Sequence, residues 1–145
     1  MRIYMDVCCW CRPFDEPLNE RIGLEAQAVL AITMRCQTCK WELFSSPIID
    51  LELEGMHESE KKRRVLELYS YAARQAIVTQ ETQSLARRFQ RCGIKHKDSI
   101  HLAAAECNGA DVFLTVDDKL IRAAQRQGLR TAVQNPVFWI KGGYK

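Results

Sequence analysis

The chain has 145 residues, of which 47% are hydrophobic and 27% charged, and its net charge is +3. This length and composition predict one ordinary globular domain over residues 1–145, and they exclude a disordered or repeat-built protein. The N-terminal residues MRIYMD include charged side chains and lack the apolar core of a signal peptide. No apolar stretch approaches the ~20 residues that span a bilayer. We therefore expect a cytoplasmic protein without a signal peptide or membrane helix.

The first half of the chain alternates short strands with helices. A strand over 3–5 ends at Asp6 and is followed by a segment, 8–17, that contains two prolines and is predicted to be irregular. Asn19 is a plausible N-cap for a helix over 19–35. The apolar positions of that helix recur at helical spacing and are Ile22, Ala26, Val29, Leu30 and Thr33. A strand over 41–45 then leads to Ser46-Pro47, a cap and first-turn proline that begin a short helix reaching Glu54.

The second half continues the same alternation. Its predicted elements are a charged helix over 58–74, a brief strand over 76–78, a helix from Thr79 to Gly93, a helix over 98–108 followed by Gly109, a strand over 112–115, a helix over 118–127 followed by Gly128, and a strand over 131–134. Strands separated by helices of this length cannot pair as hairpins, so we expect an α/β fold with a parallel sheet and helices on both faces. In such sheets, sites lie outside the carboxyl ends of the strands.

The seven cysteines of a chain without an export signal are expected to be mostly free thiols. Cys36 and Cys39 have the spacing of half a zinc site, which Cys8, Cys9 and Cys11 could complete. A structural zinc site usually shows two such pairs, so we favour packed side chains. The basic groups could meet phosphates, but solvated helix faces are the favoured interpretation. They are Lys61 to Arg64, Arg87, Arg88, Arg91, Lys95 and Lys97.

Two acids fall on the inward face of their helices. With each residue turned by about 100°, Glu52 lies among Ile48, Ile49, Leu51 and Leu53, whereas Asp50 and Glu54 fall on the opposite side. The same arithmetic turns Asp117 towards Leu120, Ile121 and Ala124 and leaves Asp118 at the border, where it suits the helix dipole. An inward acid is costly unless it is paired, protonated or bound to a metal.

Asp6 ends a strand and Asp98 begins a helix, and each has a structural interpretation of its own. Asp98 taken alone is best explained as an N-cap, and Asp6 as the residue that starts a loop. Together with Glu52 and Asp117, however, they place four carboxylates at one edge of a parallel sheet, where they require cations. Oxygen ligands select Mg²⁺ or Mn²⁺. This donor set suits metal-assisted hydrolysis of a phosphodiester.

Other site chemistries lose support. The histidines His57, His96 and His101 form no zinc pattern, and His101 is better explained as a packed side chain. The phosphate-binding motifs GxxxxGK[ST] and GxGxxG and the nucleophile motif GxSxG do not occur in the sequence.

The ordered motifs of the chain resemble those of PIN-domain ribonucleases, in the style of VapC-type toxins. The resemblance rests on YMD ending at Asp6, SPIIDLE from Ser46 to Glu52, KDSIHLAAAE with Asp98, and LTVDD with Thr115 and Asp117, and it covers essentially the whole chain. It implies a three-layer αβα sandwich, one or two Mg²⁺ or Mn²⁺ ions, and endonucleolytic cleavage of single-stranded RNA. It further implies a small antitoxin protein as partner and a homodimer.

Carried over by position, the acidic quartet of that family falls on Asp6, Glu52, Asp98 and Asp117. Asp6, Asp98 and Asp117 are the expected metal ligands, Glu52 binds metal or acts through water, and Thr115 supports them. The chain departs from the family at Val7-Cys8, where small hydroxyl or amide residues are common. Arg12 could contact a phosphate, but a pair with Asp15 or Glu16 is favoured.

Two alternatives remain. A PIN-fold module could bind RNA or protein without cleaving, in which case the acids would bind no divalent ion. A phosphatase of the haloacid-dehalogenase type also has an Asp after its first strand, but it expects a second acid two residues later, where this chain has Cys8. The leading hypothesis is therefore a metal-dependent endoribonuclease.

Overall fold

The fold is built on a parallel sheet of five strands in the order β3-β2-β1-β4-β5. We describe it from a computed structural model, in which residues 1–38 and 40–143 are defined. The strands are β1 (Arg2–Met5), β2 (Glu42–Ser45), β3 (Arg74–Gln75), β4 (Val112–Leu114) and β5 (Ala132–Gln134). Every neighbouring pair is parallel. The predicted α/β architecture is therefore confirmed.

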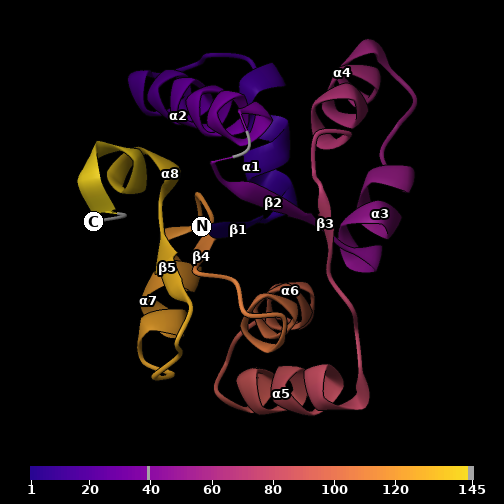
Figure 1. Ribbon diagram of the computed structural model, residues 1–145, viewed down its shortest axis with the longest axis vertical. Coiled ribbons are helices and arrows are strands. Elements are labelled where there is room, and N and C mark those ends of the chain that lie inside the picture. The colour runs from indigo at the N-terminus through magenta and orange to yellow at the C-terminus, as the bar shows by residue number, and fades with distance from the viewer. Residues whose placement is uncertain (39, 144–145) are drawn as a thin grey trace.

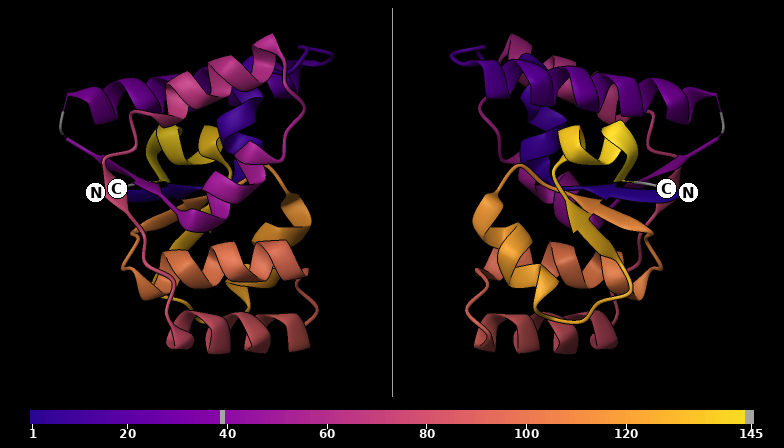
Figure 2. Two further views of the ribbon diagram at one scale, coloured as in Figure 1. Left: turned by 90° about the vertical axis from the view of Figure 1, so that its right-hand side faces the viewer. Right: turned by 90° about the vertical axis from the view of Figure 1, so that its left-hand side faces the viewer.

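Helices cover both faces of the sheet, as Figures 1 and 2 show. The helices are α1 (Val7–Cys11), α2 (Glu20–Gln37), α3 (Pro47–Glu54), α4 (Glu60–Tyr69), α5 (Gln80–Arg91), α6 (His96–Cys107), α7 (Asp118–Gln125) and α8 (Pro136–Phe138), with short turns η1 (Arg12–Phe14) and η2 (Trp139–Gly143). In Figure 2, α2 and α4 lie above the sheet, and α5, α6 and α7 lie below it. The result is the three-layer αβα sandwich.

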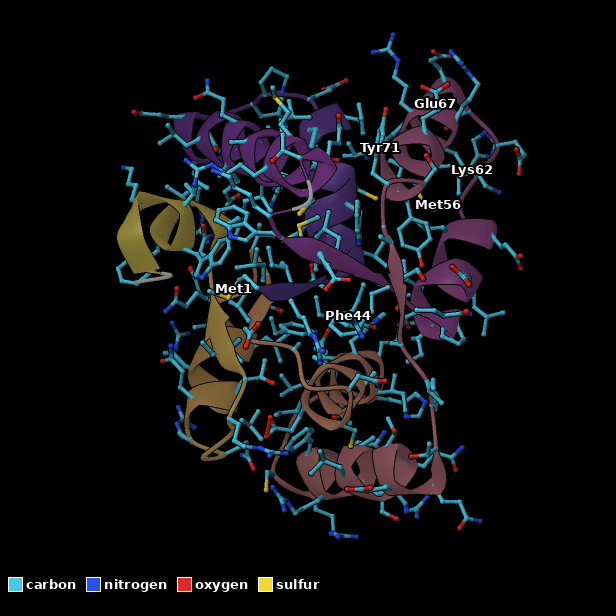
Figure 3. The ribbon with its side chains drawn as sticks, viewed as in Figure 1. Met1, Phe44, Met56, Lys62, Glu67 and Tyr71 are labelled. Atoms are coloured by element: carbon cyan, nitrogen blue, oxygen red, sulfur yellow. The ribbon has the colours of Figure 1, made fainter. Side chains whose placement is uncertain are left out.

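The core lies between these layers, centred on β1. Ile3, Tyr4 and Met5 are completely buried, as expected for a central parallel strand covered on both faces. The Tyr4 ring stacks on that of Phe113 in β4, with centroids 5.5 Å apart. Phe44 of β2 is 1% exposed and lies inside the molecule in Figure 3, whereas Tyr71 beyond α4 is 51% exposed.

The segment after β1 is helical, which the prediction of an irregular 8–17 missed. Asp6 Oδ1 accepts a hydrogen bond from Cys9 N at 3.1 Å and thereby caps α1. Cys9 and Trp10 are completely buried, so α1 is held by packing despite its shortness. Pro13 falls in the first turn of η1, where a missing N–H costs nothing.

Helix α2 begins as predicted, and its buried face overlaps the predicted one in Val29 and Thr33. Asn19 Oδ1 accepts a hydrogen bond from Ile22 N at 2.9 Å and is the N-cap. Leu30, predicted inward, is 41% exposed. The buried residues of α2 are Glu25, Ala28, Val29, Ile32 and Thr33. The buried face is rotated towards Glu25, a carboxylate whose burial an apolar stripe does not predict.

Several boundaries differ from the prediction. Helix α4 begins at Glu60 and not near 58, because Ser59 caps it by accepting a hydrogen bond from Lys62 N at 3.1 Å. The brief strand lies at 74–75, upstream of the predicted 76–78, because Ala76 N already makes the last bond to Ser45 O, at 2.8 Å. The C-terminal α8 was not predicted; Asn135 Oδ1 caps it, accepting from Val137 N at 2.8 Å.

Each cysteine within the described ranges is a free thiol, as expected. Cys39, the second member of the predicted half zinc site, lies outside the described residues. In the part of the chain that the structure describes, no helix is both long and apolar enough to cross a membrane.

Candidate active site

The acids singled out in the sequence lie around the carboxyl edge of the sheet. β1 and β4 are neighbours in register, with Met5 beside Leu114, so Asp6 and Asp117 emerge at the same edge. Asp6 N donates to Leu114 O at 3.2 Å, which continues the pairing by one residue. Glu52 lies on α3, which follows β2, the neighbour of β1 on its other side. Asp98 lies in the first turn of α6.

Asp6 is the most deeply buried member, with 4% of its surface exposed. Burial raises the pKa of its carboxyl group, although hydrogen bonds from Thr115, Cys9 and Cys8 lower it in part. The Cys8 thiol donates to Asp6 Oδ2 at 3.4 Å. The residue two positions after Asp6 therefore contacts its carboxylate through a thiol.

Asp98 is not an N-cap, contrary to its simplest interpretation. Lys95 is the N-cap of α6 and makes no side-chain capping bond, which places Asp98 in the first turn of the helix. Burial raises the pKa of the Asp98 carboxyl group, and the charges of Asp6 and Asp117 raise it further. Asp6 and Asp117 are therefore both close enough to Asp98 to disfavour its charged form.

A small cavity of about 130 Å³ separates the first turns of α6 and α7. Asp98 and Asp117 line it together with two cations, Lys95 and Lys119. Its remaining walls are Gly93, Ile94, Leu120 and Ala123. Asp98 and Asp117 are therefore both accessible from this cavity.

Asp117 and its neighbour Asp118 have different surroundings. Asp117 Oδ1 caps α7 by accepting from Lys119 N at 3.0 Å and Leu120 N at 3.2 Å, while Asp117 N donates to Thr115 Oγ1 at 3.2 Å. Asp118 is exposed and forms a paired contact with Arg21, whose Nη1 and Nη2 each lie 2.9 Å from one carboxylate oxygen. Arg21 lowers the pKa of Asp118. Asp117 belongs to the acidic site, and Asp118 to an ion pair outside it.

Glu52 differs from the three aspartates because its hydrogen-bond partner is a buried histidine. Its Oε1 lies 2.6 Å from Nε2 of His101, which donates since a carboxylate only accepts. This hydrogen bond lowers the pKa of Glu52. Asp50 and Glu54 are exposed as predicted, but Leu51, predicted inward, is 69% exposed, so the buried face of α3 is narrower than expected.

His101 is buried, as expected for a packed side chain, but its link to Glu52 was not predicted. It lies three residues after Asp98 on α6, and this spacing, which puts two side chains on one helix face, is the only sequence signal for it. Its Nδ1 is hydrogen-bonded to the Tyr4 hydroxyl at 2.7 Å. His101 therefore joins the acidic site through Glu52.

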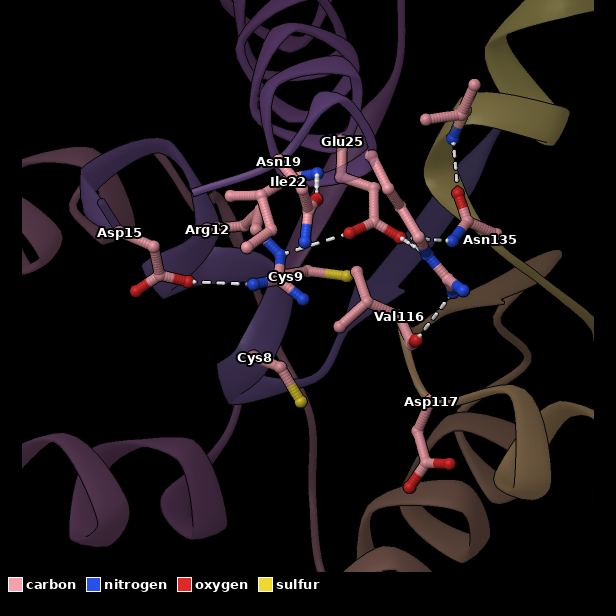
Figure 4. Close-up of polar contacts among 12 residues, drawn as sticks. Cys8, Cys9, Arg12, Asp15, Asn19, Ile22, Glu25, Val116, Asp117 and Asn135 are labelled. Carbon is pink, nitrogen blue, oxygen red and sulfur yellow. Dashed lines mark hydrogen bonds and ion pairs between the residues drawn. The ribbon is translucent and has the colours of Figure 1, made fainter. Parts of the chain in front are cut away.

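A second unpredicted feature is the cluster around Glu25, shown in Figure 4. Glu25 Oε2 accepts from Arg21 Nε at 3.0 Å and from Asn135 Nδ2 at 2.6 Å, and its Oε1 lies 3.2 Å from Arg12 Nε. Arg12 also pairs with Asp15 at 3.1 Å, as favoured from the sequence. In Figure 4 the Asp117 carboxylate points away from this cluster. The cluster supports the site without belonging to it.

These carboxylates suit a hard cation that keeps part of its water shell better than a cation coordinated by protein atoms alone. Within residues 1–38 and 40–143, no three His, Cys, Asp or Glu side chains form a ready-made metal site. Mg²⁺ keeps several waters and needs only one or two carboxylates of the protein. Burial raises the pKa of Asp98 most, and a bound cation would relieve the repulsion from Asp6 and Asp117 that raises it further.

Comparison with known proteins places the fold. No family model matches the chain, and no curated protein matches it in sequence. Among solved structures, the chain is similar to one in the FitAB complex bound to an IR36 DNA fragment, with a TM-score of 0.57 and 18% identity over 93% of this chain and 95% of the other. The chain therefore has a PIN-like fold, as the order of its acidic motifs predicted.

Proposed function

We propose that the protein is a Mg²⁺- or Mn²⁺-dependent endoribonuclease that cleaves single-stranded RNA. The observation that supports this most directly is the gathering of Asp6, Asp98 and Asp117 at one sheet edge, with Asp98 destabilised by the other two charges. An acidic site beside a cavity lined by lysines suits a substrate that brings phosphate and a cation together.

Each residue has a definite task in this proposal. Asp98 and Asp117, with Asp6 behind them, would hold the cation, and Lys95 and Lys119 at the cavity would contact substrate phosphates. A bound divalent cation supplies Lewis-acid stabilisation of the phosphate and leaving oxygen, and makes water more acidic. Glu52, held by His101, would orient the attacking water.

We further propose that the protein is the toxin of a toxin–antitoxin pair. FitAB is a complex of a PIN-domain toxin with its antitoxin, which supports a small antitoxin protein as partner for this chain. A homodimer is expected from the resemblance of the sequence to PIN-domain toxins. A short neighbouring reading frame for a DNA-binding protein would support the assignment to such a pair.

Cleavage by the purified protein tests the proposed activity. We expect single-stranded RNA to be cut in Mg²⁺ or Mn²⁺, and cutting to stop when the cation is removed with EDTA. The matched control is the Asp6→Asn, Asp98→Asn double variant, which keeps the side-chain shapes and removes two charges. Equal rates for wild type and double variant would show that the cutting has another source.

Binding of Mg²⁺ should stabilise the protein in a pH-dependent way. The pKa values of Asp6 and Asp98 are raised, so between their ordinary and raised values the folded state holds more protons than the unfolded state. Without metal, the contribution of these two groups to the stability of the fold is therefore lost as pH rises through that window. Below the window, protons compete with Mg²⁺ for the carboxylates. At about 100 times its Kd, Mg²⁺ should add about 2.7 kcal/mol above the window.

The measurement is the Tm with and without Mg²⁺ at pH 7.5 and pH 4.5. We expect a rise in Tm at the higher pH, a much smaller one at the lower pH, and little in Asp98→Asn at either. The same rise at both pH values, or in the variant, would place the bound ion elsewhere.

A non-catalytic module on this fold is the second candidate, favoured by one observation. The acids within the described residues do not form a ready-made three-ligand site. Calorimetric titration with Mn²⁺ separates the two candidates, because a module without function at the acids should bind no ion that Asp98→Asn removes.

A further inference from the structure

A chain of buried polar groups ends at Glu52. The His101 ring is 2% exposed and lies between Tyr4 and Glu52, 2.7 Å from the Tyr4 hydroxyl and 2.6 Å from Glu52 Oε1. The Tyr4 hydroxyl also lies 3.1 Å from Ser46 Oγ. Ser46 in turn caps α3, accepting from Ile48 N at 3.1 Å. One continuous series of contacts therefore joins Ser46, Tyr4, His101 and Glu52, and it connects β1, α6 and both ends of α3.

This chain restricts a side chain that would otherwise be mobile. Glu52 stands on a helix of eight residues, and its side chain is 21% exposed. A Glu side chain has several rotamers of similar energy, and restricting it to one of them costs conformational entropy. A donor held rigidly from its other ring nitrogen removes that freedom, as hydrogen-bonded carboxylate–histidine pairs do around metal sites.

The surroundings of Glu52 also separate it from the three aspartates. Burial and, after it, the charges of Asp6 and Asp117 raise the pKa of Asp98, whereas the hydrogen bond from His101 and, to a smaller extent, the charge of Lys97 lower the pKa of Glu52. Glu52 thus lies outside the group of carboxylates that a cation would relieve. Its bond to His101 uses Oε1, and Oε2 is the atom left to act on a water.

We propose that His101 is a positioning residue for the cleavage reaction, holding Glu52 so that its carboxylate orients water while the aspartates bind the cation. This inference rests on the proposed function. It predicts that loss of His101 changes the rate of the chemical step and leaves cation and RNA affinity nearly unchanged.

The test compares His101→Leu, which removes the donor at similar size, with His101→Gln, whose amide restores a donor near Nε2. His101→Leu should lower kcat by about 10- to 100-fold with KM nearly constant, and His101→Gln should recover most of that loss. Mn²⁺ affinity by calorimetry should stay within about twofold of wild type in both variants, while it falls in Asp98→Asn. Glu54→Gln, on the exposed side of α3, is the control for Glu52→Gln.

A double-mutant cycle gives the sharpest reading. If His101 acts only through Glu52, His101→Leu should cost almost nothing further in the Glu52→Gln background. Additive losses, or a drop in Mn²⁺ affinity as large as that of Asp98→Asn, would overturn the positioning role. Wild-type cleavage that His101→Leu leaves intact would also overturn it, with the proposed function unharmed. Absence of wild-type cleavage would overturn both.

Discussion

Asp117→Asn should lower RNA cleavage by about 100- to 1000-fold, whereas Asp118→Asn should leave most of it. The magnitude is that of losing one electrostatic contact to a reacting centre. Asp117 shares its cavity with Asp98 and adds to the repulsion there, whereas Asp118 is paired with Arg21 and exposed to solvent. Substitution of these two adjacent acids should therefore affect the cleavage rate very differently.

The substitution is mild for the fold, which makes the comparison clean. Asn caps helices as well as Asp, so Asp117→Asn keeps the bonds to Lys119 N and Leu120 N. Asp118→Asn gives up only a solvent-exposed ion pair, which contributes little to stability. Initial cleavage rates in Mg²⁺, with Tm measured for both variants, are the readout. A larger loss for Asp118→Asn would exchange the roles assigned to the two acids.

The sequence predicted the placement of the acids better than their partners. Asp6 and Asp117 could be placed at the sheet edge because parallel strands share a carboxyl end. Helical periodicity set Glu52 apart from the exposed Asp50 and Glu54. These inferences need only local structure and strand order, which the pattern of strands and helices supplies.

The partners depend on contacts between distant parts of the chain. His101 meets Glu52 across a separation of 49 residues, and Asn135 meets Glu25 across 110. Periodicity gives the face on which a side chain lies but not the residue it meets there. For the same reason the buried face of α2 was predicted to include Leu30, because nothing in the local sequence shows that Glu25 would be buried and paired with arginines.

Short elements were the other weakness, because packing and caps decide them. Helix α1 begins directly after strand β1 and Asp6, and its completely buried Cys9 and Trp10 hold it in place. Its cap is Asp6, a residue that also belongs to the candidate site. Asp6 was interpreted as a site residue, so its role as a helix cap was not predicted. The two prolines that follow favoured a loop.

Replacing Glu25 by Ala should have the largest effect on stability, a loss of about 3 kcal/mol. Removing one partner of a buried ion pair leaves charges without compensation, which costs about 3–5 kcal/mol when they stay buried. Here Arg21 is 52% and Arg12 is 19% exposed, so both can recruit water and the lower end applies. Asn135 loses its acceptor as well, which weakens the packing of α8 against α2.

Thermal unfolding checks this, with a fall in Tm of about 6–12 °C expected for a domain of this size. Glu20→Ala, at an exposed acid in the first turn of the same helix, should cost about 0.5 kcal/mol through the helix dipole alone. Arg21 also donates to Val116 O at 3.1 Å, directly before Asp117, so the Glu25 cluster ties α2 to the segment that presents a site carboxylate. Below its Tm, Glu25→Ala should therefore cleave more slowly than wild type but faster than Asp117→Asn. A Tm as high as that of Glu20→Ala would mean that the arginines hold this segment without their buried acid.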